Sequence, residues 1–451
     1  MIAQPHDALP AEPPATEAIG SVLSPIRSRT PSIGTPSSSA AIWVRMVRAP
    51  VPRSPRRPAD EDFRVRARGR RDPWPGSYRA AGVQPPPAGY DHTMRVVIVG
   101  ATGNVGTALL RRLRNEPEVT VAGVVRRLPP QVEPYDAVDW QSCDIGAPGA
   151  TELLTGIFRG ADAVVHLGWQ IQPSHDQRLL FDTNVLGSRS VTQAALRAGV
   201  SSLIVASSVG VYAPGPKNAY VTEAWPATGI LGSSYSRHKA LVEGLLDRVE
   251  VDHPTLRIVR LRPGLIFQRE VGTEIGRYFA GPLLPARLLR YGRIPVIPSH
   301  PGLRVQAVHA DDVADAYARA LLSDVRGAFN VAAGPVLDPT VAAAAFRGRE
   351  VPVPGFVLRG AADLTWRLRL QPVDVGWVRL GLKAPLMSCD RIKAELGWRP
   401  LVDAVHTLTE LVSGMAARAH TDSPPLSGDP ALPGRLGGVL RGRLPGSGNP
   451  Y

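Results

Sequence analysis

The chain has 451 residues, among them 45 prolines and 44 glycines, and a formal net charge of +13 at pH 7. This length predicts two or three domains. The two cysteines, Cys143 and Cys389, lie far apart and show neither a disulfide pattern nor metal-ligand spacing, so we expect no metal site. The chain has no apolar run of about 18 residues and no secretory signal pattern, which predicts a cytoplasmic protein that does not span a membrane.

The positive charge does not by itself indicate a nucleic-acid partner. The densest arginine cluster, at residues 64–71, is bordered by acidic residues at 60–62 and at Asp72, and no nucleic-acid-binding motif accompanies it. Arginine also outnumbers lysine along the whole chain rather than in one segment. We therefore expect a small-molecule substrate and no specific nucleic-acid binding.

The two ends of the chain differ in composition from its middle. Residues 1–93 are rich in proline, serine, alanine and arginine and lack a sustained apolar period, and residues 417–451 repeat this composition. Such segments cannot bury enough apolar surface to offset the entropy lost on ordering. We therefore predict disorder at both ends and a folded body at residues 94–416. Met94 directly precedes the first strand-like run, so an alternative is that residues 1–93 are not part of the natural product.

The folded body begins with a strand, a glycine-rich turn and a helix. Residues 95–99 are apolar and mostly β-branched, which predicts a strand covered on both faces. Helical spacing begins at Thr107, and the turn between them is Gly100-Ala101-Thr102-Gly103-Asn104-Val105-Gly106. Glycines let the backbone approach a pyrophosphate, and the N-terminus of the helix offers free N–H groups and the positive end of its dipole. This order of elements predicts a dinucleotide site rather than a plain tight turn.

The second strand carries information about the cofactor. In dinucleotide-binding folds the residue after this strand contacts the adenosine ribose, and an acidic residue there favours NAD. Here residues 119–125 form the predicted strand and Arg126 and Arg127 follow it. A guanidinium suits a 2′-phosphate, so we favour NADP over NAD. The alternative is that one or both arginines simply face solvent.

Strands and helices alternate through the rest of the body, which predicts a Rossmann-type, doubly wound parallel sheet of the α/β class. The predicted elements are strands at 162–167, 202–207, 257–261 and 329–332 and a helix at 179–198. Prolines between 282 and 301 predict an irregular second lobe. We assign the cofactor part mainly to 94–262 and 303–334, and a smaller substrate lobe mainly to 263–302 and 335–400. Apolar residues of that lobe fit its core better than a greasy pocket: Phe279, Leu283, Leu284, Leu288 and Leu289.

One short segment combines residues suited to acid/base chemistry. Tyr235 and Lys239 lie four residues apart and share one face of a helix. A neighbouring ammonium favours the phenolate, so Lys239 is expected to lower the pKa of Tyr235 toward neutrality. Upstream, Ser208 ends a predicted strand and places a hydroxyl at the edge of the sheet where ligands bind. His238 faces another side of the helix, and we expect it to be structural or solvated.

In this order the motifs resemble an extended short-chain dehydrogenase/reductase of the NAD-dependent epimerase/dehydratase family, over residues 94–416. The segments that carry the resemblance are the glycine turn, Asp144-Ile145, His166-Leu167-Gly168, Asn184-Val185-Leu186-Gly187, the run from Ser207 to Tyr212, Tyr235 to Lys239, Arg262-Pro263-Gly264, the run from Val308 to Ala314 and the run from Glu395 to Pro400.

The resemblance implies roles for individual residues. Tyr235 is expected to be the acid/base, Lys239 to lower its pKa and contact the nicotinamide ribose, and Ser208 to hold the substrate oxygen. Asp144 and Ile145 would hold the adenine ring, and the loop with Leu167 and Gly168 would lie beside the cofactor. Homodimers built on paired helices are common in the resembled family.

Departures from the family pattern reduce the number of reactions that we expect. Dehydratases of the family carry Thr-Asp-Glu where this chain has Ser208-Val209-Gly210, so dehydration is not expected. Pro263-Gly264 resembles reductases and hydroxysteroid dehydrogenases more than sugar-nucleotide epimerases. We therefore expect an NAD(P)-dependent oxidoreductase acting on an alcohol or ketone. The alternatives are a sugar-nucleotide epimerase, similar to UDP-glucose 4-epimerase, and a non-catalytic cofactor-binding sensor.

Overall fold

The structure is a computed structural model that describes residues 93–172, 174–276, 289, 292–367 and 373–427. Inter-residue contacts divide the chain between Arg71 and Asp72, and every described residue belongs to the second unit. The predicted disordered segments at residues 1–92 and 428–451 lie outside the described residues.

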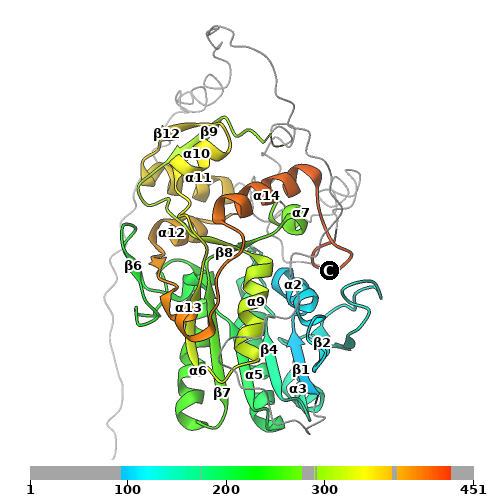
Figure 1. Cartoon of the computed structure of the whole chain (residues 1–451). Coiled ribbons are helices and arrows are strands. Elements are labelled where there is room, and N and C mark those ends of the chain that lie inside the picture. The colour runs from blue at the N-terminus through cyan, green and yellow to red at the C-terminus, as the bar shows by residue number, and fades with distance from the viewer. Residues whose placement is uncertain (1–92, 173, 277–288, 290–291, 368–372, 428–451) are drawn as a thin grey trace, which may run out of the picture. The chain divides into compact units, whose positions relative to one another are not determined.

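A parallel seven-stranded sheet forms the centre of the fold, in the order β11-β7-β5-β4-β1-β2-β3 (Figure 1). From β1 the chain adds β2 and β3 on one side, then returns to add β4, β5, β7 and β11 on the other. The predicted doubly wound α/β fold is confirmed. The strands are β1 (Met94–Val99), β2 (Val119–Val125), β3 (Asp139–Ser142), β4 (Ala163–His166), β5 (Ser202–Ala206), β7 (Arg257–Pro263) and β11 (Gly327–Val331).

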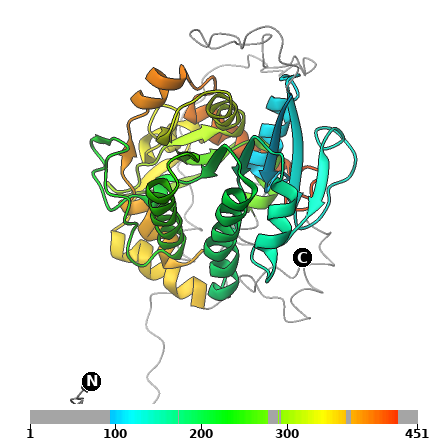
Figure 2. The same ribbon diagram turned by 90° about the horizontal axis from the view of Figure 1, so that it is seen from below.

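Both faces of this sheet are covered by helices because the side chains of each strand alternate between two apolar cores. In β1, Val96 and Ile98 enter one core and Val97 and Val99 enter the other. The first core is closed by α2 (Asn104–Leu113) and α9 (Ala310–Leu321). The second is closed by α3 (Ala150–Phe158), α5 (Gly187–Ala198) and α6 (Ser234–Asp252), and Figure 2 shows the two helical layers from below.

The helix predicted at 179–198 is divided into three parts. It consists of α4 (Gln177–Phe181), a π-helical turn η1 (Asp182–Leu186) and α5. Asp176 caps α4 by accepting a hydrogen bond from the Leu179 N–H at 2.9 Å. The π-helical turn carries the buried Asn184, whose side chain is bonded to the loop after β4. Such turns are frequent at functional sites.

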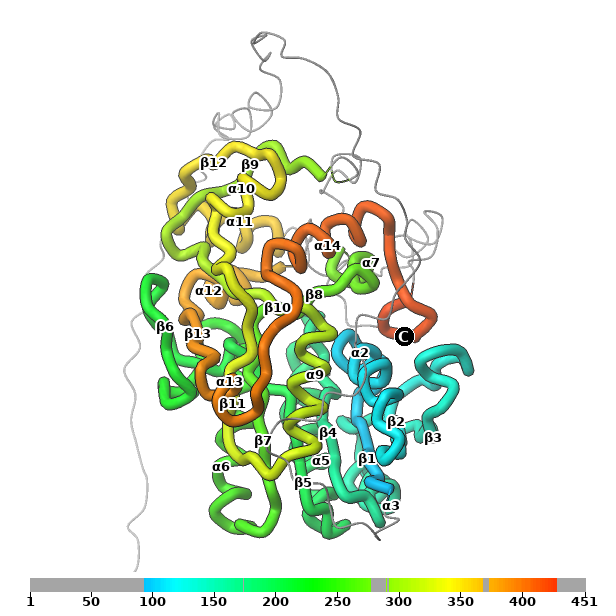
Figure 3. The backbone as a smooth tube through the Cα atoms, in the orientation of Figure 1, coloured from blue at the N-terminus to red at the C-terminus, as the bar shows by residue number. Residues whose placement is uncertain are grey.

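The remaining elements gather at one end of the main sheet (Figures 1 and 3). Three small parallel sheets pair β8 (Leu265–Phe267) with β10 (Ala307–His309), β9 (Val296–Ser299) with β12 (Arg349–Pro352), and β6 (Tyr220–Val221) with β13 (Leu386–Met387). The helices here are α7 (Gly272–Ile275), α10 (Pro339–Ala345), α11 (Gly355–Arg367), α12 (Val375–Lys383) and α14 (Ala404–Ala417). The helix α13 (Asp390–Leu396) instead packs against β11 and α9.

The apolar residues predicted to form the core of this region are only partly described. Phe279, Leu283, Leu284 and Leu288 lie outside the described residues. Leu289 is buried in a small cluster with Phe346 and Val412. None of the helices in the described part of the chain is both long and apolar enough to cross a membrane.

Residues 418–427 differ from the predicted disordered tail. After α14, Arg418 adopts a left-handed conformation and the chain turns toward α2, as the red end of the tube in Figure 3 shows. Ser423 is fully buried, and its Oγ donates a hydrogen bond to the Thr102 carbonyl at 3.0 Å. Leu426 is 1% exposed and packs in a cluster with Val271 and Leu411. The polar, proline-rich composition of this segment gave no indication that Leu426 would be buried or that Ser423 would anchor the turn before it.

Replacing Ser423 with Ala is expected to lower the free energy of unfolding by about 0.5–1.5 kcal/mol, because the buried Thr102 carbonyl loses the closer of its two side-chain donors and keeps only the Thr107 hydroxyl at 3.4 Å. Urea unfolding of the full chain measures this. Ser427→Ala is the matched control, since the Ser427 hydroxyl donates to the Pro424 carbonyl, three residues away, at 3.1 Å. Equal effects of the two changes would show that the segment does not hold the glycine turn.

Candidate functional site

The glycine-rich turn lies where the strand order reverses, between β1 and β4. Gly100 follows β1, and Leu167 and Gly168 follow β4. Gly100 has φ +85°, and a Cβ on it would lie 2.7 Å from the Gly168 backbone nitrogen. Only glycine therefore fits, and the two chain segments approach closely at the crevice where doubly wound sheets bind ligands.

The start of α2 provides the predicted phosphate cradle. Gly103 is its N-cap, and the first bond within the helix runs from the Thr107 N–H to the Gly103 carbonyl at 2.8 Å. The N–H groups of Asn104, Val105 and Gly106 precede that bond, and no acidic residue occupies the first turn. A Cβ on Gly106 would lie 2.5 Å from the Gly100 carbonyl oxygen. The glycines thus keep the helix end against the turn, and the residues present fit a bound pyrophosphate.

The side chains of the glycine-rich turn make contacts with other parts of the protein. Asn104 donates to the Ile266 carbonyl at 3.2 Å and accepts from the Gln268 amide at 2.7 Å. Thr102 is buried under Ser423, and Val105 packs against the core. These contacts tie the turn to the strand β8 region and the C-terminal segment, so its backbone geometry is preset.

The residues predicted to contact the adenosine lie near the ends of neighbouring strands. Arg126 follows β2 with an exposed side chain, and its carbonyl accepts from the Ser142 hydroxyl at 3.2 Å. Asp144 is exposed and accepts the Gly146 N–H at 3.0 Å. Ile145 is buried against the Gly168 loop and Gly187. The structure thus places Arg126, Asp144 and Ile145 at the β2 and β3 side of the glycine turn.

Ser208 and Tyr235 meet just beyond the end of β5. Ser208 caps a short 3-10 turn, η2 (Val209–Val211), by accepting the Gly210 N–H at 3.0 Å. Tyr235 lies in the first turn of α6, and its hydroxyl is within hydrogen-bonding reach of Ser208. A Cβ on Gly210 would lie 2.8 Å from the Tyr235 ring, so this glycine leaves the space that the ring occupies. Two predicted catalytic residues are therefore brought together.

Lys239 lies one turn along α6 from Tyr235. Its ammonium donates to the Ala206 carbonyl at 2.7 Å and lies 3.4 Å from the centre of the Trp169 ring, a cation–π contact. Burial lowers the pKa of Lys239 to about 7, and the negative charge of Glu243 opposes this effect.

The pKa of Tyr235 differs in direction from the prediction. Loss of water raises the pKa of Tyr235 to about 12, and the hydrogen bond with Ser208 opposes this only in part. Lys239 was expected to lower this pKa. Its ammonium instead lies 6.0 Å from the centre of the tyrosine ring and bonds a backbone carbonyl. In the protein alone, desolvation outweighs the lysine charge.

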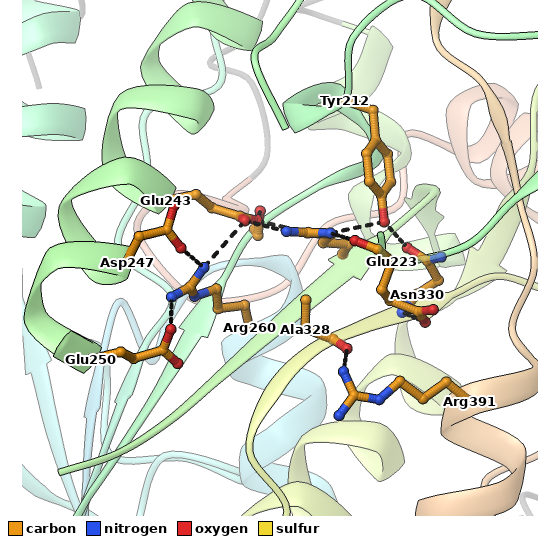
Figure 4. Close-up of polar contacts among 11 residues, drawn as sticks. Tyr212, Glu223, Glu243, Asp247, Glu250, Arg260, Ala328, Asn330 and Arg391 are labelled. Atoms are coloured by element: carbon orange, nitrogen blue, oxygen red, sulfur yellow. Dashed lines mark hydrogen bonds and ion pairs between the residues drawn. The ribbon is translucent and has the colours of Figure 1, made fainter. Parts of the chain in front are cut away.

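A buried ion-pair network holds α6 at Glu243, one helical turn beyond Lys239, and Figure 4 shows Glu243 with Arg260, Asp247 and Glu250. Glu243 accepts hydrogen bonds from Ser207 and from two nitrogens of Arg262, and Arg262 also donates to the Tyr212 hydroxyl at 3.0 Å. Burial alone would raise the pKa of Glu243, but the bonds and charge of Arg262 bring it below its usual value. Arg260 extends the network to Asp247 and Glu250. The network joins α6 to β5 and β7.

The structure also identifies residues near Tyr235 that the sequence did not single out. Trp169 packs edge-on to the Tyr235 ring with centres 6.0 Å apart, and Trp377 of α12 lies at 4.9 Å. Asn184 bonds both backbone groups of Gln170. His238 is 1% exposed rather than solvated. Sequence offered no signal for Trp377, since it lies far downstream, whereas Asn184 belongs to a segment already noted.

Comparison with known proteins identifies a matching family. A family model described as "NAD dependent epimerase/dehydratase family" matches residues 96–332. An uncharacterized protein of Mycobacterium tuberculosis is 24% identical over 332 residues, covering 71% of this chain and 83% of its own. The decarboxylating sterol-4-alpha-carboxylate 3-dehydrogenase of Saccharomyces cerevisiae is 27% identical over 182 residues, which cover 38% of this chain and 51% of that protein.

Solved structures share the fold. UDP-glucose 4-epimerase of Thermus thermophilus, in complex with NAD, superposes with a TM-score of 0.54 at 22% identity, over 72% of this chain and 100% of its own. Within the described ranges, no three His, Cys, Asp or Glu side chains come together as metal ligands. From the family match, which spans more than half of the sequence, we conclude that the chain is an enzyme that belongs to the NAD dependent epimerase/dehydratase family.

Proposed function

We propose that the protein is an oxidoreductase that transfers hydride between a nicotinamide cofactor and a C–O centre of an alcohol or ketone. The observation that carries this proposal is the meeting of Tyr235 and Ser208 at the end of β5, with Lys239 one helical turn away. Strand β5 neighbours β4, whose following loop contacts the glycine turn. Acid/base groups and cradle thus share one edge of the sheet.

Each group has a role that follows from its surroundings. The nicotinamide cofactor, when bound, supplies the hydride acceptor or donor. Tyr235 exchanges a proton with the substrate oxygen, and the Ser208 hydroxyl holds that oxygen in place. Lys239, held by the Ala206 carbonyl, contributes positive charge beside the site. The Thr-Asp-Glu of the dehydratases is replaced by Ser208-Val209-Gly210, which favours redox chemistry without elimination of water.

Extraction of the bound cofactor followed by a substrate panel tests this function. The protein is denatured, the released nucleotide is identified, and alcohols, ketones and nucleotide sugars are offered with NAD and with NADP. Net oxidation or reduction supports the proposal. Interconversion of sugar epimers with no net change in cofactor would indicate an epimerase. Cofactor binding without turnover of any class would indicate a sensor.

We also propose that NADP is preferred, because Arg126 follows β2 with an exposed guanidinium suited to a 2′-phosphate. Arg126→Glu is expected to lower the ratio of kcat/KM with NADP to kcat/KM with NAD by about 10- to 100-fold, because a charge-assisted contact with the 2′-phosphate is lost. Arg159→Glu, an equal charge change at another exposed arginine, is the control. An unchanged ratio in Arg126→Glu would contradict the assignment.

A further inference from the structure

We propose that Gln170 and His238 bind a neutral, hydroxyl-bearing part of the substrate, in a pocket beside Tyr235. This inference deepens the function proposed above and rests on it. Neither residue belongs to the predicted catalytic or cofactor-binding set, and sequence analysis placed His238 among structural or solvated residues.

The pocket lies between α6, η1 and the start of α12. Its walls include Gln170, Leu180, Tyr235, His238 and Trp377, and they leave room for about one group of the size of a water molecule or a hydroxyl. Tyr235 and His238 come from the same face of α6. The pocket therefore adjoins the acid/base hydroxyl rather than lying elsewhere on the molecule.

His238 presents an unpartnered nitrogen at this pocket. The residue is 1% exposed, and its ring packs edge-on against Phe181 with centres 5.6 Å apart. No hydrogen-bond partner for its Nε2 exists in the part of the chain that the structure describes. Burial, together with the nearby charge of Arg237, lowers the pKa of His238 to about 4. The imidazole is therefore neutral near pH 7 and offers either an N–H or a lone pair.

The side-chain amide of Gln170 likewise has, among the described residues, an unpartnered nitrogen and an unpartnered oxygen at this pocket. It is 6% exposed, and within residues 93–427 as described neither its Nε2 nor its Oε1 has a hydrogen-bond partner. Its backbone is fixed, because Asn184 accepts the Gln170 N–H at 2.8 Å and donates to the Gln170 carbonyl at 2.9 Å. A buried amide held in position but unbonded costs stability, and a ligand that bonds it explains why it is kept.

The character of the walls limits what this ligand can be. None of the described lining residues is Lys or Arg, so the pocket does not suit a phosphate or carboxylate. Asp374, the carboxylate at the rim, already accepts the Trp377 N–H at 3.1 Å as a helix cap. A hydroxyl both donates and accepts, which matches an amide and a neutral imidazole. A single hydroxyl also matches the small size of the space.

The spacing of residues along α6 places this hydroxyl site close to Tyr235. Tyr235 and His238 are three residues apart on a helix, which separates their Cβ atoms by about 5–6 Å. A hydroxyl held by His238 and Gln170 would therefore lie near a reacting C–O group held by Tyr235 and Ser208. The pocket selects the substrate by a hydroxyl near the carbon that is oxidised or reduced.

Two probes that differ by one hydroxyl test the proposal: trans-cyclohexane-1,2-diol and cyclohexanol. Binding to the NADP-saturated full chain is followed by tryptophan fluorescence, and oxidation by NADPH absorbance. We expect the diol to bind at least about 10-fold more tightly than cyclohexanol, the value of one or two hydrogen bonds. Gln170→Met and His238→Leu should each reduce this preference to about threefold or less, and His238→Gln should restore part of it.

Controls separate recognition from folding. Gln131→Met and His253→Leu make the same changes at exposed positions and should leave the preference intact. The melting temperatures of Gln170→Met and His238→Leu should be unchanged or higher, because each removes a buried unpaired group. Equal or undetectable binding of the two probes overturns the proposal, as does an equal loss of both in the variants. A diol preference in binding without oxidation of either probe leaves the pocket assigned and counts against the proposed redox function.

Discussion

Tyr235→Phe is expected to lower kcat/KM by about 10²–10⁴-fold, the contribution of a positioned general acid/base. Phenylalanine keeps the ring between Trp169 and Trp377 and removes only the hydroxyl that bonds Ser208. Steady-state kinetics on the best substrate of the panel measures the loss. Cofactor affinity should change by less than about threefold, because hydroxyl removal leaves the glycine cradle untouched.

The matched control is Tyr220→Phe, which makes the same change at a tyrosine that is 60% exposed. It should retain full activity. If Tyr235→Phe retained its activity while Tyr220→Phe behaved like the unmodified protein, Tyr235 would not be the acid/base. If no substrate were turned over and cofactor binding persisted in both, the sensor function would be favoured.

The raised pKa of Tyr235 predicts the pH dependence. With a pKa of about 12, the hydroxyl keeps its proton at neutral pH and can donate it to a carbonyl oxygen as that carbonyl is reduced. Oxidation of an alcohol needs the deprotonated form, so its kcat/KM should rise with pH across the neutral range. Profiles of kcat/KM in both directions check this, since they report groups of the free enzyme. A reduction rate that falls steadily above pH 7 would contradict it.

The second large effect is expected at Arg262. Arg262→Met should lower the free energy of unfolding by about 3–5 kcal/mol, because it leaves the Glu243 carboxylate buried without its main partner. Chemical denaturation measures the change. Arg248→Met, at an exposed position of α6, the helix that carries Glu243, is the control and should have little effect. The double variant Arg262→Met, Glu243→Met should recover much of the loss, because two apolar groups need no charge partner.

The same network gives a pH dependence of stability. The pKa of Glu243 is lowered in the folded protein, chiefly by Arg262 acting against the effect of burial. Ionised Glu243 therefore contributes its full stabilisation at a pH above its pKa in the unfolded chain, which is about 4.3 for glutamate. This stabilisation is lost as the pH falls through the lower pKa of the folded protein. The unmodified protein should lose more stability than the Glu243→Met, Arg262→Met double variant between neutral pH and pH 3. Parallel pH curves would contradict this.

The sequence predicted the fold well because its signals were local. Residues 95–99, 119–125 and 257–261 are short segments rich in apolar, β-branched residues, and each forms an interior strand of the sheet. The glycine turn was recognisable because strand, turn and helix are adjacent in sequence, and the structure shows why Gly100 and Gly106 tolerate no side chain. β3 was missed because its residues, Asp139–Ser142, are polar and largely exposed at the sheet edge.

The surroundings of the site were less predictable, because they depend on desolvation and on distant contacts. The four-residue spacing of Tyr235 and Lys239 gave no measure of how much water each loses, and burial reversed the expected direction of the tyrosine pKa. The position of His238 one residue before Lys239 indicated that the two side chains point in different directions from the helix. It gave no sign of the pocket formed there by a loop after β4 and by α12. The preference for NADP stays a prediction.

The bond between Ser423 and Thr102 has a consequence for biosynthesis. These residues are 321 positions apart, and the bond is buried. Contacts so distant in sequence form late, since most of the chain must be available before they can close. During translation the strands of the sheet can emerge and pair in order. The first glycine turn to leave the ribosome, however, reaches its final packing only after the C-terminal segment has been made. The glycine-rich part of the cofactor site is therefore synthesised early in translation, and its packing is completed only when translation is nearly finished.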